Sequence, residues 1–282
     1  MTLRRLLVWL SLWFALLLGA VPAGADPLSF GIFPRRNATI TVRMFNPLAD
    51  YLSRELHRPV QLVISKDFDA FWRQVEERRF DLVHFNQYHY LKARRLGYRV
   101  ILSNQEFGSD TLAGALYVRK DSPITEVTAL AGRKIVFGGG KDAMMSYIVP
   151  RYLLQSAGLK DGDYQADFAL NPPNAVLAVV NGQADAAGAG DVVRQFLPNP
   201  DDQAAVRILA KGEPLRQHPW AVRETLDPPL RDELRRLLLA LNDSAEGRAL
   251  LEQAGLSGLS AASEADYEGC RAVVEAVFGV VD

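Results

Sequence analysis

Short apolar runs alternate with helical patterns along most of this chain, and few folds accommodate such an alternation. Residues 28–32, 60–64 and 80–83 are apolar runs of strand length. Between them, apolar side chains at i, i+3 and i+4 predict helices over 45–56 and from Asp67 onward, with Asp67 as the N-cap. This order of strand, helix and strand is typical of a parallel sheet covered by helices.

The alternation starts again near residue 115, which indicates a second α/β lobe. Further strands are predicted at 98–102, 115–119, 134–137, 166–170, 185–187 and from Val206, and further helices at 144–156, 174–181, 229–241, 245–254 and 263–278. No Pro- or Ser-rich linker separates the sections. The chain is therefore expected to cross between the lobes on strands and not on a flexible tether.

The first 25 residues have the features of a secretory signal peptide. Arg4 and Arg5 precede an apolar run over 6–18, and the small residues of segment 23–25 stand before Asp26. We expect cleavage after Ala25 and a periplasmic protein. The alternative, an uncleaved membrane anchor, is less favoured because the apolar run is short for a bilayer.

Composition narrows the possible functions of the remaining chain. The 32 Lys and Arg residues against 33 Asp and Glu residues give a formal net charge of −1, which disfavours nucleic acid as a partner. The only cysteine, Cys270, lies in a helical pattern, so no intramolecular disulfide can form. No second apolar run of about 18 residues follows the N-terminal segment. We expect a soluble, monomeric protein.

A glycine triplet, Gly138–Gly140, separates the apolar run 135–137 from a helical pattern that begins near Ala143. Glycines permit backbone conformations that other residues avoid, and the first turn of a helix offers unpaired N–H groups to a ligand. The triplet is equally compatible with a plain loop, so it indicates a site only in combination with the rest of the chain.

Several segments in chain order resemble the phosphate, phosphite and phosphonate family of periplasmic substrate-binding proteins, which serve ATP-driven (ABC) importers. The matching segments are 46–52, 66–68, 80–83 with Asn86, 118–124, 130–134, 180–187 and 218–219. The resemblance implies a two-lobed type II periplasmic binding protein, each lobe a mainly parallel sheet flanked by helices, that closes over its ligand. It also implies crossing strands near 112–118 and 206–211. One lobe then holds 26–112 with 210–282, and the other holds 113–209.

The resemblance further implies where the ligand binds and how this chain departs from the family. The hydroxyl-rich sequence that caps a second-lobe helix in the family falls on Ala143, Met144, Met145 and Ser146, and two family tyrosines fall on Phe68 and Leu112. A histidine expected near 171–174 is absent, a family glutamate falls on Val192 beside Asp191, and an aspartate before proline falls on His218. The ligand-binding residues expected on this basis are Phe33, Phe68, Asn86, Leu112, Ala143, Met144, Met145, Ser146, Tyr147, Asn174, Asp191 and His218.

The lost hydroxyls disfavour free phosphate, because each charge-assisted hydrogen bond contributes on the order of 1.5–3 kcal/mol. We expect instead a small organic or oxyanion ligand in a more apolar cleft. Alternatives remain for single residues. Met144 and Met145 are equally compatible with packing beneath their helix, Phe68 fits a buried helix face, and His218 fits an ordinary surface loop.

The sequence shows no established catalytic or cofactor motif. His84 and His89 are five residues apart, a spacing that fails the helical i, i+4 pair, so neither a metal nor another cofactor is expected. Gly-x-Ser-x-Gly and complete phosphate-loop motifs are absent. The favoured function is therefore that of a non-enzymatic solute-binding protein with a small ligand and a membrane permease as partners. The alternatives are a ligand-sensing subunit of a membrane receptor kinase or cyclase, and an exported enzyme with an unrecognised site.

Overall fold

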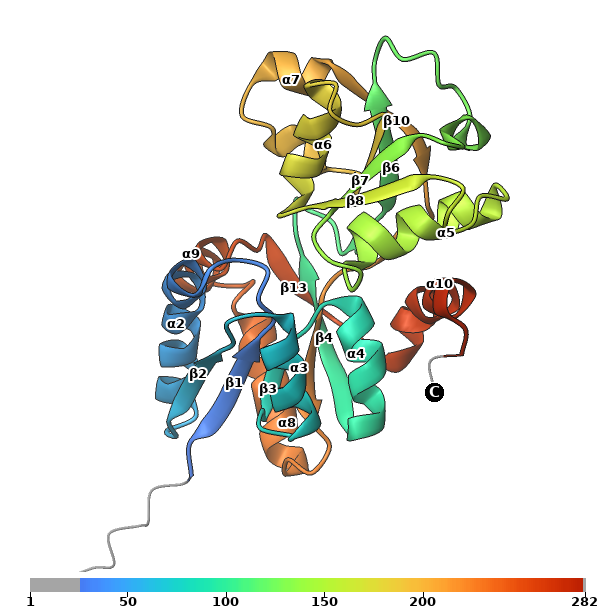
Figure 1. The fold of residues 1–282 in the computed structure, drawn as a ribbon. Coiled ribbons are helices and arrows are strands. Elements are labelled where there is room, and N and C mark those ends of the chain that lie inside the picture. The colour runs from blue at the N-terminus through green and yellow to red at the C-terminus, as the bar shows by residue number, and fades with distance from the viewer. Residues whose placement is uncertain (1–25, 281–282) are drawn as a thin grey trace, which may run out of the picture.

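The computed structural model describes residues 26–280, which form two α/β lobes, one above the other in Figure 1. The predicted signal peptide, residues 1–25, lies outside the described residues. Among the described residues, no helix combines the length and the apolar character that crossing a membrane requires. The lone cysteine, Cys270, is buried, and this burial raises the pKa of its thiol to about 12.

The first lobe is built on a six-stranded sheet with the order β13-β4-β12-β3-β1-β2. Its strands are β1 (Leu28–Ile32), β2 (Val60–Ile64), β3 (Leu82–His84), β4 (Tyr98–Gln105), β12 (Pro219–Arg223) and β13 (Gly258–Ala261). β1 runs parallel to β2 and β3, whereas β12 runs antiparallel to both β3 and β4. The carboxyl ends of β1, β3 and β4 therefore lie at one edge of the sheet, beside the start of β12.

Helices cover this sheet, several of them fixed by side-chain caps. They are α2 (Ala38–Glu55), α3 (Phe68–Glu76), α4 (Gln87–Ala93), α8 (Pro228–Ala240), α9 (Ala245–Gln253) and α10 (Glu268–Phe278), with short 3₁₀ turns η1 (Arg94–Leu96) and η5 (Glu264–Tyr267). Asp67 caps α3 by accepting a 2.7 Å hydrogen bond from the N–H of Ala70, as predicted. Asn37 caps α2 in the same way, so α2 begins seven residues before the predicted start.

The second lobe has a five-stranded sheet with the order β10-β6-β9-β7-β8. Its strands are β6 (Gly114–Arg119), β7 (Lys134–Gly138), β8 (Gln165–Ala169), β9 (Ala186–Gly190) and β10 (Val206–Lys211). Its helical elements are η2 (Val127–Leu130), the π-helix η3 (Met144–Ile148), α5 (Val149–Ser156), α6 (Pro172–Val180), η4 (Val193–Phe196) and α7 (Pro200–Ala204).

Most strands of each sheet run in one direction, as expected, and the few opposed strands make both sheets mixed. In the second sheet β7 is parallel to β8 and β9, but β6 is antiparallel to β9 and β10. The opposed strands β6 and β12 are the first sheet strands that the chain forms after each passage between the lobes. Between the lobes, β5 (Thr111–Leu112) pairs with β11 (Leu215–Arg216) in a two-stranded antiparallel link.

The π-helix η3 lies directly against the second sheet because two glycines leave room for its backbone. A Cβ at Gly188 would lie 2.4 Å from the carbonyl oxygen of Ser146, and one at Gly114 would lie 2.8 Å from that of Met145. An apolar cluster then continues from η3 into the first lobe, where it includes Phe33 and Phe71. Figure 1 shows α10 beside α4 and below α5, which places this helix next to both lobes.

Candidate functional site

A row of aromatic rings lies on the first lobe where its parallel strands end. Phe33, directly after β1, stacks on His218, directly before β12, with ring centroids 5.1 Å apart. On its other side Phe33 lies 6.4 Å from Phe68, which stacks on His89 of α4 at 5.3 Å. We call His218, Phe33, Phe68 and His89 the aromatic row. In open α/β sheets, ligands bind outside the carboxyl ends of the strands, so the row is well placed to contact a ligand.

A carboxylate lies at each end of the aromatic row. At the His218 end, Nδ1 lies 3.4 Å from Oε1 of Glu106. At the His89 end, Nε2 lies 3.1 Å from Oδ2 of Asp142. Glu106 follows β4 and belongs to the first lobe, whereas Asp142 follows the glycine triplet after β7 and belongs to the second. We call these contacts the Glu106 pair and the Asp142 pair.

The Glu106 pair is part of a buried network. Nη1 and Nη2 of Arg35 donate to the two carboxylate oxygens of Glu106 at 3.0 and 3.4 Å. Asn104 Nδ2 also donates to Glu106 at 2.9 Å, and the indole N–H of Trp220 donates to Asn104 at 2.6 Å. The Glu106 side chain is 7% exposed, that of Arg35 29%. A buried carboxylate is stable only when its lone pairs are satisfied, as these donors do here.

Burial and neighbouring charges set the protonation states in this network. Burial raises the pKa of Glu106, but the charge of Arg35 and the hydrogen bonds to His218 and Arg35 outweigh it and hold that pKa well below its usual range. Burial lowers the pKa of His218, with Glu106 opposing it, and burial likewise lowers the pKa of His84. At neutral pH the network therefore holds an ionised Glu106 beside neutral imidazoles.

On the second lobe, η3 and the residue before it lie where the two lobes meet. Met144, Met145 and Ser146 are buried, with exposed fractions of 2%, 7% and 5%, and Ala143 is half-buried. Met144 and Met145 belong to the same apolar cluster as Phe33, so this cluster extends from η3 of the second lobe into the first lobe. Ser146 is the only hydroxyl among the four residues from Ala143 to Ser146.

Polar and aromatic contacts connect the two lobes directly. Asn86, the N-cap of α4, donates from Nδ2 to the carbonyl oxygen of Asp142 at 3.1 Å, beside the Asp142 pair. On the rim next to Glu106, Phe107 of the first lobe contacts Phe196 of the second with ring centroids 4.8 Å apart. Both phenylalanines are about half exposed. The described arrangement is therefore one in which the lobes touch.

The structure brings some of the expected site residues together and leaves others elsewhere. Phe33, Phe68 and His218 form part of the aromatic row, and Asn86 contacts the loop that leads into Ala143. Tyr147 instead packs on Phe137 and Phe168, within the second lobe. Asn174 is exposed in the first turn of α6, where its N–H donates to Asn171. Leu112 and Asp191 lie at the link between the lobes: Leu112 pairs with Leu215, and Asp191 accepts from the N–H of Ala113.

Sequence reasoning missed Arg35, Glu106 and Asp142 as residues of this region, and it treated His89 only as a metal candidate. Arg35 carried a signal, since it follows the first strand in the turn that leads to α2. Asp142 also carried one, since it stands between the glycine triplet and Ala143. Glu106 carried none, because its 71-residue separation from Arg35 is closed only by the sheet.

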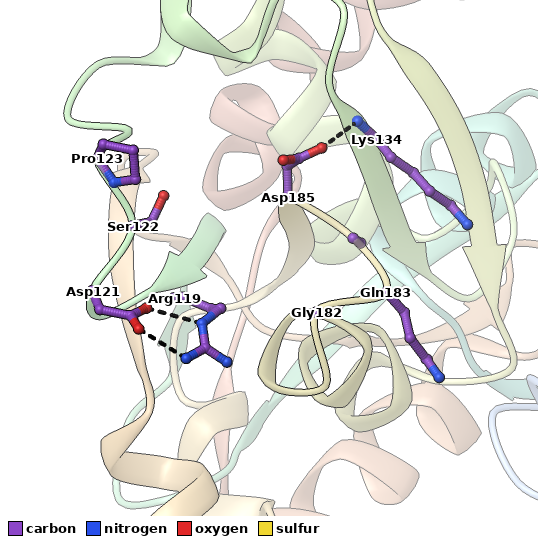
Figure 2. A pocket seen from close by; sticks show the side chains of 9 residues that line it. Arg119, Asp121, Ser122, Pro123, Lys134, Gly182, Gln183 and Asp185 are labelled. Atoms are coloured by element: carbon purple, nitrogen blue, oxygen red, sulfur yellow. Dashed lines mark hydrogen bonds and ion pairs between the residues drawn. The ribbon is translucent and has the colours of Figure 1, made fainter.

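Two other kinds of candidate site, a metal centre and a surface hollow, are less suitable than the region around the aromatic row. Within residues 26–280, no group of three or more His, Cys, Asp or Glu side chains is arranged to hold a metal ion. A hollow of about 360 Å³ lies on the second lobe at the start of β7, at the sheet edge opposite η3, and Figure 2 shows the residues that line it. Its charged groups already have partners: Arg119 binds Asp121, the ammonium group of Lys134 lies 3.2 Å from Oδ2 of Asp167, and Asp185 accepts from the backbone N–H of Lys134.

Residues 30–267 match the family described as the periplasmic substrate-binding protein of phosphonate ABC transporters. This chain belongs to that family. Its members are binding proteins and not enzymes, and they work with a small ligand and a permease. The matched residues include the sheets of both lobes except the first two residues of β1.

Solved structures share the fold at low sequence identity. PhnD1 from Prochlorococcus marinus, solved with methylphosphonate, has a TM-score of 0.75 and 18% identity, over 90% of this chain and 99% of that one. A Xanthomonas citri protein solved with ATP has a TM-score of 0.77 and 17% identity, over 90% and 97%. A binding protein component of an ABC phosphonate transporter from Pseudomonas aeruginosa has a TM-score of 0.72 and 17% identity, over 88% and 85%. At such identities the likeness establishes the two-lobed periplasmic binding protein fold.

Proposed function

We propose that this protein binds a small organic molecule or an oxyanion other than free phosphate between its lobes and presents it to the permease of an ABC importer. The observation that carries the proposal is the composition of the second-lobe face. Ala143, Met144 and Met145 provide no hydroxyl groups, and the two methionines join the apolar cluster that contains Phe33. A phosphate group needs several hydrogen-bond donors, whereas an organic solute gains from burying apolar surface on methionine and phenylalanine.

The proposed binding residues come from both lobes. Phe33, Phe68, Asn86 and His218 contribute from the first, and Ala143, Met144, Met145 and Ser146 from the second. Tyr147, Asn174, Leu112 and Asp191 stay in the proposed set with a lesser part, since the contacts given above engage them within the second lobe or at the link. The division into 26–112 with 210–282 and 113–209, together with export by a signal peptide cleaved after Ala25, also belongs to this proposal.

A thermal-shift screen of the purified protein tests the ligand class. Phosphate, phosphite, methylphosphonate, short sulfonates, carboxylates and amino acids form the panel. A ligand at 100 times its Kd adds about 2.7 kcal/mol to the stability of the folded state. For a protein of this size, that corresponds to a rise in Tm of about 5–10 °C. Stabilisation by micromolar free phosphate would contradict the proposed ligand class.

A reconstitution experiment tests the role of the partner. With the cognate permease and ATPase in lipid vesicles, the loaded protein should stimulate ATP hydrolysis more than the ligand-free protein does. If the same ligand instead activates a neighbouring membrane kinase or cyclase and leaves the ATPase unchanged, the sensing alternative replaces transport.

A further inference from the structure

We propose that Arg35 is the anion-binding group of the cleft, so that the ligand is a small organic anion whose charged head binds the first lobe and whose apolar part faces Met144 and Met145. This inference rests on the proposed function and adds to it the chemical class of the ligand and the direction in which it lies. It differs from the indication of the sequence, in which the unpaired N–H groups of the helix that begins near Ala143 meet the ligand.

The position of Arg35 is fixed by a chain of buried side chains. Trp220 donates a hydrogen bond to Asn104, and Asn104 donates one to Glu106. Glu106 in turn accepts from the two terminal nitrogens of Arg35. A guanidinium carries five N–H donors, and the contact with Glu106 uses two of them. The remaining donors can bind a second, planar or tetrahedral oxyanion without a rearrangement of the network. Such preorganisation reduces the conformational entropy that binding costs.

The charges around Arg35 do not balance. Arg36 follows it, is exposed, and experiences the charges of Arg35 and Glu106. Burial lowers the pKa of Arg36, and the adjacent Arg35 lowers it further. Two guanidinium groups thus lie within electrostatic range of one carboxylate, and only that of Arg35 pairs with it. A ligand with one negative charge would neutralise the excess.

Arg35 also lies beside the place where the lobes meet. Its guanidinium carbon is 6.0 Å from the ring centroid of Phe33, a member of the aromatic row. Its partner Glu106 is followed directly by Phe107, whose ring contacts Phe196 of the second lobe. A ligand head at Arg35 would therefore have Phe33 beside it and the second lobe opposite it.

The second lobe, by contrast, repels an anion at the start of η3. Asp142 stands immediately before Ala143, and its side chain is 45% exposed. The hydrogen bond with His89 lowers the pKa of Asp142, so this carboxylate is ionised at neutral pH. A ligand anion at the first turn of η3 would lie close to this like charge, at an element whose first two side chains are methionines.

Titration calorimetry with solutes that share one propyl tail tests the proposal. The panel is propanesulfonate, butyrate, propylphosphonate, propylammonium and 1-propanol. The wild type should bind one or more of the three anions and neither the amine nor the alcohol. Arg35→Gln should weaken that binding about 10- to 100-fold, as expected for a lost charge-assisted hydrogen bond. Lys141→Gln, which removes the exposed cation next to Asp142, is the control and should change it less than threefold.

A double variant separates a binding role from a structural one. Arg35→Gln alone leaves Glu106 buried without its cation, so the protein can lose binding because the lobe is disturbed. Arg35→Gln combined with Glu106→Gln removes both charges and restores the balance. If Arg35 binds the ligand, the double variant regains thermal stability but not anion binding. Recovery of anion binding in the double variant would overturn the proposal.

The remaining outcomes separate this inference from the proposed function. Binding of propylammonium or 1-propanol in place of the anions, or anion binding that Lys141→Gln weakens more than Arg35→Gln, overturns the inference and leaves the solute-binding function standing. If the wild type binds none of the five solutes and no compound of the thermal-shift panel, both fail.

Discussion

The two histidine–carboxylate pairs at the ends of the aromatic row have the same chemistry but different positions in the fold. In the Glu106 pair both residues belong to the first lobe, and Arg35, Asn104 and Trp220 hold the carboxylate in place. In the Asp142 pair the histidine belongs to the first lobe and the carboxylate to the second. The first pair can therefore exist in any arrangement of the lobes, whereas the second exists only while they touch.

This difference suggests a division of tasks. A network that one lobe holds by itself is suited to fix a ligand before closure. A contact that forms only between lobes contributes to the free energy of closure and is lost on opening. Four experiments can break or sharpen this comparison.

The largest expected effect comes from Glu106→Leu. The substitution leaves Arg35, Asn104 and His218 without the carboxylate they surround. We expect a loss of about 2–3 kcal/mol in the free energy of unfolding, less than for a fully buried pair because Arg35 is partly exposed. Urea denaturation measures it. Glu233→Leu removes the carboxylate of a more exposed pair, with Arg236 on α8, and should cost clearly less than Glu106→Leu because solvent screens this pair. Equal losses in the two variants would mean that Glu106 has no special role.

Acidification should have the next largest effect on the stability of the folded protein. Burial lowers the pKa values of His84, His89 and His218, so the folded state resists protonation while the unfolded chain, with a pKa near 6.5, accepts protons. Stability should fall as pH decreases from 7 to 6, by at most about 0.7 kcal/mol for each histidine. Glu106 adds no slope in this range because its folded and unfolded pKa values are both lower.

Measuring Tm between pH 7 and pH 6 in two variants shows which histidine–carboxylate pair causes the loss of stability. His89→Gln and His218→Gln replace one titrating ring each, and each should flatten the profile. A rise in Tm on acidification would show that a histidine is protonated in the folded protein, in contradiction to the neutral imidazoles inferred here.

Asp142→Ala should have a smaller effect on stability and a specific effect on shape. It removes the acceptor for the buried Nε2 of His89, which costs about 1 kcal/mol in the arrangement in which the lobes touch. Small-angle X-ray scattering should then show a larger radius of gyration without ligand. Lys141→Ala changes the neighbouring exposed residue and should leave the radius as in the wild type. An unchanged radius in Asp142→Ala would mean that the pair does not hold the lobes together.

The contact between Phe107 and Phe196 should contribute least, because both rings are about half exposed. A double-mutant cycle with Phe107→Asn and Phe196→Ala should give a coupling energy of about 0.5–1 kcal/mol, measured by urea denaturation. Asparagine suits position 107 because the backbone there has φ 57°, a conformation that asparagine tolerates better than most residues. A coupling near zero would make this contact incidental.

Much of the fold could be predicted from local sequence, and the reason is visible in particular elements. β1, β2 and the start of β10 lie where their apolar runs predicted, because period and β-branched content are properties of neighbouring residues. α4 was missed because it is short and buries polar residues such as Gln87 and His89, which an apolar pattern cannot reveal. The two-lobed organisation followed from the resemblance to a known family and is confirmed.

The candidate site was less predictable. Position along the family pattern indicated Phe33, Phe68 and His218, and the structure places all three in the aromatic row. The same pattern could not indicate Arg35, Glu106 or Asp142, because their partners are far away along the chain. Arg35 and Glu106 are 71 residues apart, and Asp142 is 53 residues from His89.

The sequence by itself determined which segments become strands and helices, that an α/β fold forms, and that two methionines follow β7 at positions where the resemblance implies hydroxyl groups. The tertiary structure alone decided which charges meet: that Glu106 pairs with Arg35 inside one lobe and that Asp142 reaches His89 across the cleft. The physical reason is range. Secondary structure depends on neighbours a few residues apart, whereas burial and electrostatic pairing depend on surfaces that become adjacent only when sheets and lobes assemble.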